Sequence, residues 1–293
     1  MKGFFAAPLG ALVLLGHAGA QAPLDPAKTS DALAITRKIA CSLTDGKPVT
    51  YYWRGEAYSR RAGEADRHLF NVEGMNVRAC VSASDGEGFN LVSRELLFYV
   101  DKDTGKILKR WKNPWTGEDV AVLHVANDPV NGKYRAIGRD GKPYSWSGVI
   151  SGDRWWQTTT VPLFYSNPLA SEYQKEIGGA YHATEMFNFF GDKASLLDRA
   201  RADAGNVSVG WVRVSDWLPW MMMGGREGVI YFHTAGRRLD SWDELPVFMK
   251  TEIAQNYPEY SAPPPLDDAR ANMTSWKYYD SVKKGVVKAP ERK

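Results

Sequence analysis

The chain has 293 residues, of which 44% are hydrophobic and 24% charged, and its formal net charge is +3 at pH 7. This weak net charge disfavours nucleic-acid binding, because proteins with that function carry a strong basic field. The length is sufficient for one large domain or two small ones, and we expect a single large domain.

The first 20 residues have the pattern of a secretory signal peptide. A lysine precedes an apolar run over residues 4–15, and small residues before a cleavage point end at Ala20. The run is too short to span a bilayer, and no later apolar segment has the length for it. We therefore expect a periplasmic or secreted protein without stable membrane insertion, and a retained anchor is the alternative. Residues 21–38 are then an N-terminal extension.

The chain has two cysteines, Cys41 and Cys80. In an oxidising compartment they are able to form a disulfide, and two buried free thiols are the alternative. Neither has a second Cys or a His at ligand spacing, so the sequence disfavours a zinc site. The sequence alone leaves their pairing open.

Residues 39–280 are predicted to form a single β-rich domain. Segments rich in aromatic and β-branched residues alternate there with Gly, Asp and Asn turn signals. The predicted strands are Val49–Tyr58, His68–Val81, Phe89–Tyr99, Ile107–Lys112, Asp119–Val125, Lys133–Ile137, Tyr144–Gly148, Trp155–Val161, Ala180–Phe190, Asn206–Ser215 and Val229–Gly236. Their regular spacing predicts a mainly β fold: an antiparallel curled sheet or a barrel of calycin-like form, with a few peripheral helices.

Helices are predicted at the margins of this series. We expect one over Leu33–Ile39 and a short one over Lys193–Arg201. Ser241-Trp-Asp-Glu244 has the form of a helix cap before a helix over Leu245–Tyr257. The prolines that follow predict an extended segment, and residues 281–293 are expected to be a loose tail.

Seven motifs carry a family resemblance. In chain order they are Ala40-Cys-Ser-Leu43, Phe70-Asn-Val-Glu-Gly74, Asn113-Pro-Trp-Thr-Gly117, His124-Val-Ala-Asn-Asp-Pro-Val130, Pro162-Leu-Phe-Tyr-Ser-Asn-Pro168, Glu185-Met-Phe-Asn188 and Trp217-Leu-Pro-Trp220. Together they resemble the bacterial domain of unknown function 1838 family, from about Ile39 to Tyr279. The resemblance implies a single bacterial domain without an established reaction, so the chemistry must be argued from the side chains.

The sequence gives no sign of a cofactor or a resident metal. No dinucleotide-binding glycine pattern, phosphate loop or Gly-x-Ser-x-Gly elbow occurs. His124, His182 and His233 lie on separate predicted strands and form a candidate metal set with Asp128 and Glu185. Because no two of these histidines have the close spacing that fixes two ligands on one element, metal-free histidines are the favoured interpretation.

Four residues are the candidates for acid–base chemistry. His124, His182 and Glu185 are able to exchange protons, and Asp128 is a candidate to orient an imidazole. These groups lie in or beside the motifs named above. We expect the catalytic residues among them, with His124 and Asp128 as the favoured pair.

The strand over Tyr181–Asn188 cannot present all its polar groups to one cavity. Alternation places Tyr181 and Glu185 on one face, and His182 and Asn188 on the other. If the first face lines the interior, Tyr181 and Glu185 are the proton donors or bases; if the second does, His182 and Asn188 take that role. A purely structural role for one face is the other interpretation.

Substrate contacts are predicted at four further residues. An inward Arg94 would hold a carboxylate or an enolate, although a structural role is favoured, and Asn127 is a candidate to polarise an oxygen. Most of the 11 tryptophans are expected to fill the core. Trp115 and Trp220 lie beside proline-containing loops and are candidates for the mouth of a pocket.

These patterns favour an exported enzyme that uses no cofactor. Its reaction would be a proton transfer of the lyase, isomerase or hydratase type, on a small apolar oxygenated or aromatic molecule. The alternative is a periplasmic binding or carrier protein that sequesters the same kind of ligand without chemistry. The identity of the ligand and the oligomeric state do not follow from the sequence.

Overall fold

The computed structural model describes residues 22–165 and 173–290. The leader expected over residues 1–20 lies outside the described residues. Within them, no helix combines the length and the apolar character that a membrane span requires.

One antiparallel sheet of ten strands dominates the fold, which confirms the mainly β fold predicted from the sequence. Its strands are β1 (Val49–Arg60), β2 (His68–Ser82), β3 (Gly88–Val100), β6 (Val125–Asn127), β7 (Gly132–Arg135), β8 (Val149–Ser151), β9 (Arg154–Tyr165), β10 (Tyr181–Asp192), β11 (Ser208–Ser215) and β12 (Val229–Arg238). Their order is β6-β3-β2-β1-β12-β11-β10-β9-β8, and β7 also pairs with β3. A separate hairpin consists of β4 (Arg110–Lys112) and β5 (Asp119–Ala121).

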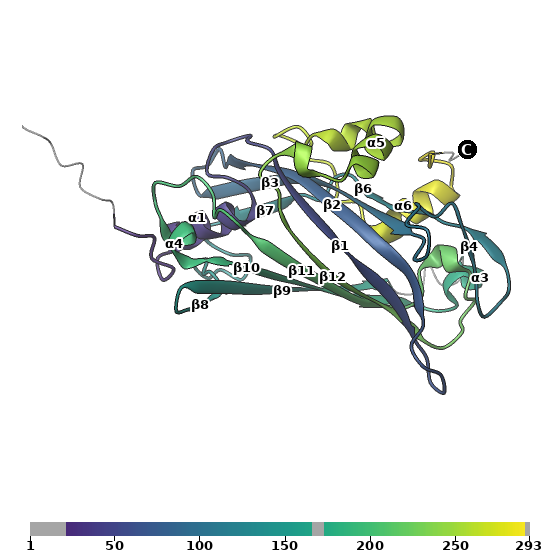
Figure 1. Cartoon of the computed structure of the whole chain (residues 1–293). Coiled ribbons are helices and arrows are strands. Elements are labelled where there is room, and N and C mark those ends of the chain that lie inside the picture. Colours follow the sequence, from purple (N-terminus) through teal and green to yellow (C-terminus); the bar gives the residue numbers. More distant parts are fainter. Residues whose placement is uncertain (1–21, 166–172, 291–293) are drawn as a thin grey trace, which may run out of the picture.

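The sheet is strongly curled. Figure 1 shows β1, β2 and β3 facing β8, β9 and β10 across a concave side, and β12 and β11 connect the two halves. Among the described residues, the outermost strands β6 and β8 do not pair with each other. The sheet is therefore open. Of the two predicted alternatives, the curled sheet is confirmed and the closed barrel is wrong. Both outermost strands have only three residues, which gives little edge for a closing ladder.

Helices cover the ends and the outer side of the curled sheet (Figure 1). They are α1 (Thr29–Ala40), α3 (Gln174–Ile177), α4 (Lys193–Leu197), α5 (Val247–Asn256) and α6 (Ser275–Lys283), with short 3-10 helices η1 (Pro219–Met221), η2 (Trp242–Glu244) and η3 (Pro258–Ser261). Helices α1 and α4 lie at one end of the sheet and α3 and α6 at the other, whereas α5 lies over its outer side.

Two local predictions differ from the structure. The predicted strand Tyr144–Gly148 is a loop, and its aromatic residues reach the core by side-chain contacts: Trp146 donates to Gln157 on β9 at 2.8 Å. The cap predicted at Ser241 precedes η2 and makes no capping hydrogen bond. Helix α5 begins after Pro246, a residue suited to a helix start because it has no N–H to satisfy.

Side-chain alternation divides the core between the two faces of the sheet. The concave face holds an aromatic cluster that includes Tyr51, Trp53, Phe70, Tyr99, Trp211 and Phe232. On the outer face, Met75 of β2 and Leu96 of β3 pack in one cluster with Met249 of α5. Because β2 and β3 are covered on both sides, their buried residues do not follow a simple in-and-out pattern.

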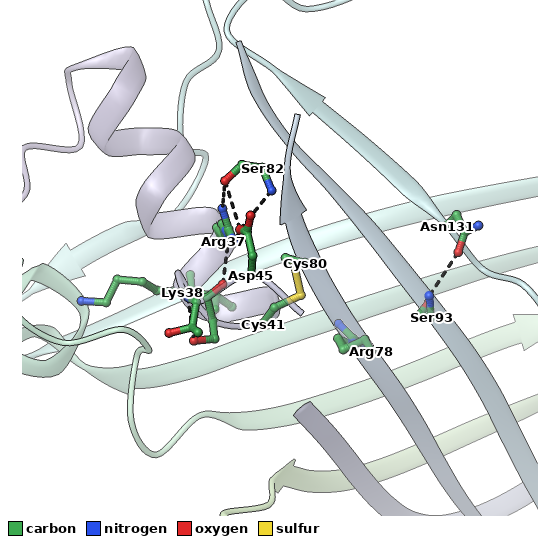
Figure 2. Close-up of a disulfide and its surroundings, with 12 residues drawn as sticks. Arg37, Lys38, Cys41, Asp45, Arg78, Cys80, Ser82, Ser93 and Asn131 are labelled. Atoms are coloured by element: carbon green, nitrogen blue, oxygen red, sulfur yellow. Dashed lines mark hydrogen bonds and ion pairs between the residues drawn. A yellow bond between two sulfur atoms is a disulfide. The ribbon is translucent and has the colours of Figure 1, made fainter. Parts of the chain in front are cut away.

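A disulfide joins Cys41, directly after α1, to Cys80 on β2 (Figure 2). Next to it, Asp45 accepts hydrogen bonds from Arg37 and from the backbone and hydroxyl of Ser82. Helix α1 also buries Ala32 and Ile35 completely. The bridge thus fixes α1 against one end of the concave face.

Candidate functional site

The curl of the sheet decides which face of β10 is inside. Tyr181 is 2% exposed and Glu185 points to the same concave side, whereas the side chain of His182 is 62% exposed on the outer face. Asn188 lies on that outer face too and accepts a hydrogen bond from Thr158 at 3.0 Å. Of the two alternatives, the interior therefore receives Tyr181 with Glu185.

Arg213 of β11 connects these two residues. Its Nη1 lies 2.7 Å from Glu185 Oε1, and its Nη2 donates to the Tyr181 hydroxyl at 2.9 Å. Burial by itself would lower the pKa of Arg213, but the neighbouring Tyr181 and Glu185 raise it, so the guanidinium keeps its charge. The Tyr181 oxygen acts as an acceptor in this bond, which leaves its own proton for another partner.

Glu95 of β3 approaches the same place from the opposite half of the sheet. It lies between Asn76 and Asn127, its cross-strand neighbours on β2 and β6. Burial, followed by the charge of Glu185, raises the pKa of the Glu95 carboxyl to about 7, although a hydrogen bond from Asn127 opposes the shift. A carboxyl group with such a pKa exchanges protons near neutral pH.

Arg78 adds a second positive charge to this face. Its Nε donates to Asn76 Oδ1 at 2.6 Å, its guanidinium lies 4.8 Å from the centre of the Tyr51 ring, and burial lowers its pKa. No carboxylate of the described residues forms an ion pair with it. The carboxyl group of Glu95 is the acidic neighbour whose charge acts on Arg78.

Glu95, Tyr181, Glu185 and Arg213 form what we call the charged cluster. A small cavity lies between its two halves. Its volume is about 20 Å³, and Glu95, Glu185, Arg213 and Tyr99 are among its lining residues. That volume is sufficient for about one water molecule. The Nε of Arg213 and the Oδ1 of Asn127 are buried and have no hydrogen-bond partner among the described residues. Buried polar groups of this kind are uncommon and mark a place where a polar molecule is expected.

His124 lies beside this cluster and lines a neighbouring interior cavity together with Tyr181. Its Nδ1 accepts the backbone N–H of Tyr99 at 3.0 Å, and its Nε2 lies 2.9 Å from the carbonyl oxygen of Leu108. The first bond assigns the ring proton to Nε2, which therefore donates to Leu108. Both ring nitrogens thus bind backbone groups, and the structure gives His124 a part in holding β3 to the following loop.

Asp128 and Arg94 belong to the outer side of the sheet. Asp128 forms ion pairs with Arg94, at 3.1 Å, and with Arg270, at 2.7 Å, and it does not orient His124. Arg94 Nη1 also donates to the carbonyl oxygens of Glu259 and Ala262, at 2.7 and 2.9 Å. These contacts fasten the segment after α5, which is the structural role favoured for Arg94.

The two candidate pocket tryptophans have different surroundings. Trp115 donates to Glu64 at 2.9 Å and packs against Trp217, with ring centres 5.0 Å apart. Trp220, on η1, is 5% exposed, and it lines both an interior cavity and an open groove. Trp220 is therefore the one of the two that borders a pocket leading inward.

The groove beside Trp220 has a volume of about 600 Å³. It runs between the β4–β5 hairpin, η1 and α6, and its wall includes Val120, Val122, Met222 and Val282. A second interior cavity of about 20 Å³ shares Leu123, Trp220 and Tyr279 with the groove, and Tyr99, Val125, Leu218 and Ser275 with the cavity at Glu95. The groove, this second cavity and the cavity at Glu95 thus adjoin one another in that order through shared lining residues.

Glu95 and Arg213 were not among the residues that the sequence singled out for the site. A signal for each exists: Arg213 shares its strand face with Val209 and Trp211, and Glu95 shares its face with Leu97. A charged residue on an apolar strand face must be buried with a partner or lie at the edge. The alternation marks both residues as unusual without showing that they meet.

The candidate metal set is dispersed. His233 and His182 point to the outer face, and His124 is held by the backbone. In residues 22–165 and 173–290, no three His, Cys, Asp or Glu side chains are grouped as metal ligands.

The comparisons with known proteins add a family. A family model described as "Protein of unknown function (DUF1838)" matches residues 46–283, which include all of the charged cluster. No curated protein matches the chain.

Proposed function

The chain belongs to the DUF1838 family of proteins of unknown function, and from its interior charged cluster we propose that it is an exported, cofactor-independent proton-transfer enzyme. The reaction is of the lyase, isomerase or hydratase type, and the substrate is a small apolar molecule with a carbonyl or carboxylate oxygen. The observation that carries the proposal is the meeting of Glu95 with Glu185 and Arg213 around one cavity, with Tyr181 hydrogen-bonded to Arg213.

In the proposed mechanism, Glu95 removes a proton from a carbon next to the oxygenated group. An isomerisation returns this proton to a different carbon, and a lyase or hydratase reaction passes it to the group that leaves from the adjacent carbon. The raised pKa of Glu95 suits both directions of transfer near neutral pH. Arg213 and the Tyr181 hydroxyl donate hydrogen bonds to the substrate oxygen, on which negative charge develops. Glu185 is a positioning residue that holds the guanidinium at 2.7 Å.

The location outside the cytoplasm is part of the proposal. The Cys41–Cys80 disulfide supports it, since structural disulfides persist in oxidising compartments. We also propose that the curled sheet serves as a calycin-like barrel does, by enclosing a ligand on its concave side.

The experiment is proton exchange with the solvent. The purified protein is incubated in deuterated buffer with a panel of small apolar and aromatic aldehydes, ketones and carboxylates, and deuterium uptake is measured by mass spectrometry. We expect uptake into a member of the panel and a loss of about a hundredfold or more in Glu95→Gln. The matched control is Glu56→Gln, which changes an exposed carboxylate on β1 and should leave the rate unchanged.

A carrier protein is the second candidate, because the groove of about 600 Å³ is large and apolar while the space at Glu95 admits only about one water molecule. Tight binding of a panel compound without exchange or conversion at any pH would favour the carrier. Exchange that persists in Glu95→Gln would contradict the mechanism.

A further inference from the structure

We propose that the groove between the β4–β5 hairpin and α6 binds the apolar body of the substrate, and that Trp220 is the wall between this groove and the charged cluster. The occupant is an aromatic or aliphatic molecule with one carbonyl or carboxylate end, and that end points toward Arg213. This inference rests on the proposed function for its inner end, whereas binding in the groove is independent of it.

The size and lining of the groove suit such an occupant. Its volume of about 600 Å³ lies within the range of about 300–1,000 Å³ that is typical of small-molecule sites. Two other large cavities, of about 370 and 430 Å³, share no lining residue with the interior cavities. The first of them is bordered by charged residues such as Arg201, Asp203 and Arg238. Among these three, the groove is the apolar one that continues inward.

The direction of the occupant follows from an unsatisfied donor. The groove wall offers aliphatic side chains and the rings of Trp220 and Tyr279, and its charged residues are two lysines and two carboxylates, which balance in sign. The inner end of the path offers the guanidinium of Arg213 beside Glu185 and Glu95. The Nε of Arg213 is buried and has no hydrogen-bond partner among the described residues, so a carbonyl or carboxylate oxygen at the inner end would satisfy it.

Trp220 controls the connection. Its indole lines both the groove and the cavity next to it, and it packs against Tyr99 and Trp111 with ring centres 5.1 and 5.9 Å apart. Because the two inner cavities hold only about one water molecule each, a substrate larger than water reaches Glu95 only when the side chains at this wall move. Trp220 is thereby a specificity-determining residue.

The test uses prodan, a naphthalene ketone whose fluorescence reports an apolar environment. Ala121 is exposed on β5 and lines the groove, so Ala121→Trp fills the groove without disturbing the core. We expect the Kd for prodan to rise about tenfold or more in this variant. Ala235→Trp is the matched control, since Ala235 is exposed on β12 away from the groove, and its Kd should stay within about twofold of the native value.

A second blocking variant guards against local misfolding. Ala289→Trp approaches the groove from its other wall and should weaken prodan binding in the same way. Circular dichroism checks that each variant is folded. Naphthoate should compete with prodan in the native protein and compete about tenfold more weakly in Arg213→Lys, which keeps the charge but loses the planar fork.

The outcomes separate the groove from the reaction. Unchanged prodan binding in both folded blocking variants, or no binding to the native protein, overturns the groove as the ligand site. Equal competition by naphthoate in Arg213→Lys overturns the proposed direction. If the groove is the ligand site but the proposed reaction is wrong, the blocking variants bind prodan more weakly. In that case the native protein and Glu95→Gln show the same rate of deuterium exchange.

Discussion

Glu95 and Glu185 line one cavity although four strands of the sheet, β2, β1, β12 and β11, lie between their own strands. Only the curl of the sheet brings the two carboxyl groups together, and Arg213 binds one of them. The arrangement separates their tasks: Glu185 is engaged in an ion pair, while Glu95 lies between two asparagines on the neighbouring strands.

The first prediction concerns pH and Glu95. A carboxyl group with a pKa raised to about 7 holds its proton longer in the folded chain than in the unfolded chain. As the pH rises from the pKa of Glu95 in the unfolded chain toward 7, the unfolded chain loses this proton first, and the free energy of unfolding falls. The total loss due to Glu95 is about 3 kcal/mol. We expect Glu95→Gln to remove this slope and to be more stable than the native protein at pH 8, in urea unfolding at pH 5 and pH 8.

Glu56→Gln serves as the control for this experiment, because Glu56 is exposed on the outer face of β1. It should retain the native dependence on pH. A native-like slope in Glu95→Gln would show that the pKa of Glu95 is not the cause.

The second prediction concerns the buried ion pair. Arg213→Met leaves the Glu185 carboxylate without its partner at 2.7 Å, and the cost should be about 3–5 kcal/mol. The double variant Arg213→Met/Glu185→Leu removes both charges and should recover a large part of that loss. Urea unfolding of the two single variants and the double variant gives the coupling energy, and strictly additive losses would rule out a direct interaction.

The third prediction distinguishes the two histidines that the sequence offers as acid–base candidates. His124→Gln disturbs hydrogen bonds to the backbone of Tyr99 and Leu108 and should cost about 1–3 kcal/mol of stability. His182→Gln changes an exposed side chain and should cost less than about 0.5 kcal/mol. Thermal unfolding at constant pH measures both. If His124→Gln leaves the stability unchanged, the structural role of His124 is wrong.

The fourth prediction concerns the disulfide. Cys41 and Cys80 are 39 residues apart, and a cross-link of that span restricts the unfolded chain by about 4 kcal/mol. Cys41→Ser/Cys80→Ser should lose stability of that order, and reduction of the native protein should have a similar effect. The double variant should in turn be insensitive to reductant. Equal stability with and without reductant in the native protein would argue against the bridge.

The sequence by itself determined the strands, because an alternating pattern with β-branched and aromatic residues is a local property of each segment. It also determined the family, and it indicated that Tyr181 and Glu185 share a face opposite to His182. Aromatic residues alone did not define a strand at Tyr144–Gly148, since those rings reach the core from a loop.

The tertiary structure decided which face is inside and which residues meet there. Alternation gives each strand two faces, but the direction of the curl determines which of them is concave. It turned Glu95 and Arg213 inward, turned Arg94 and His182 outward, and left the sheet open. Contacts between distant strands depend on pairing across the whole sheet, and no local pattern encodes them.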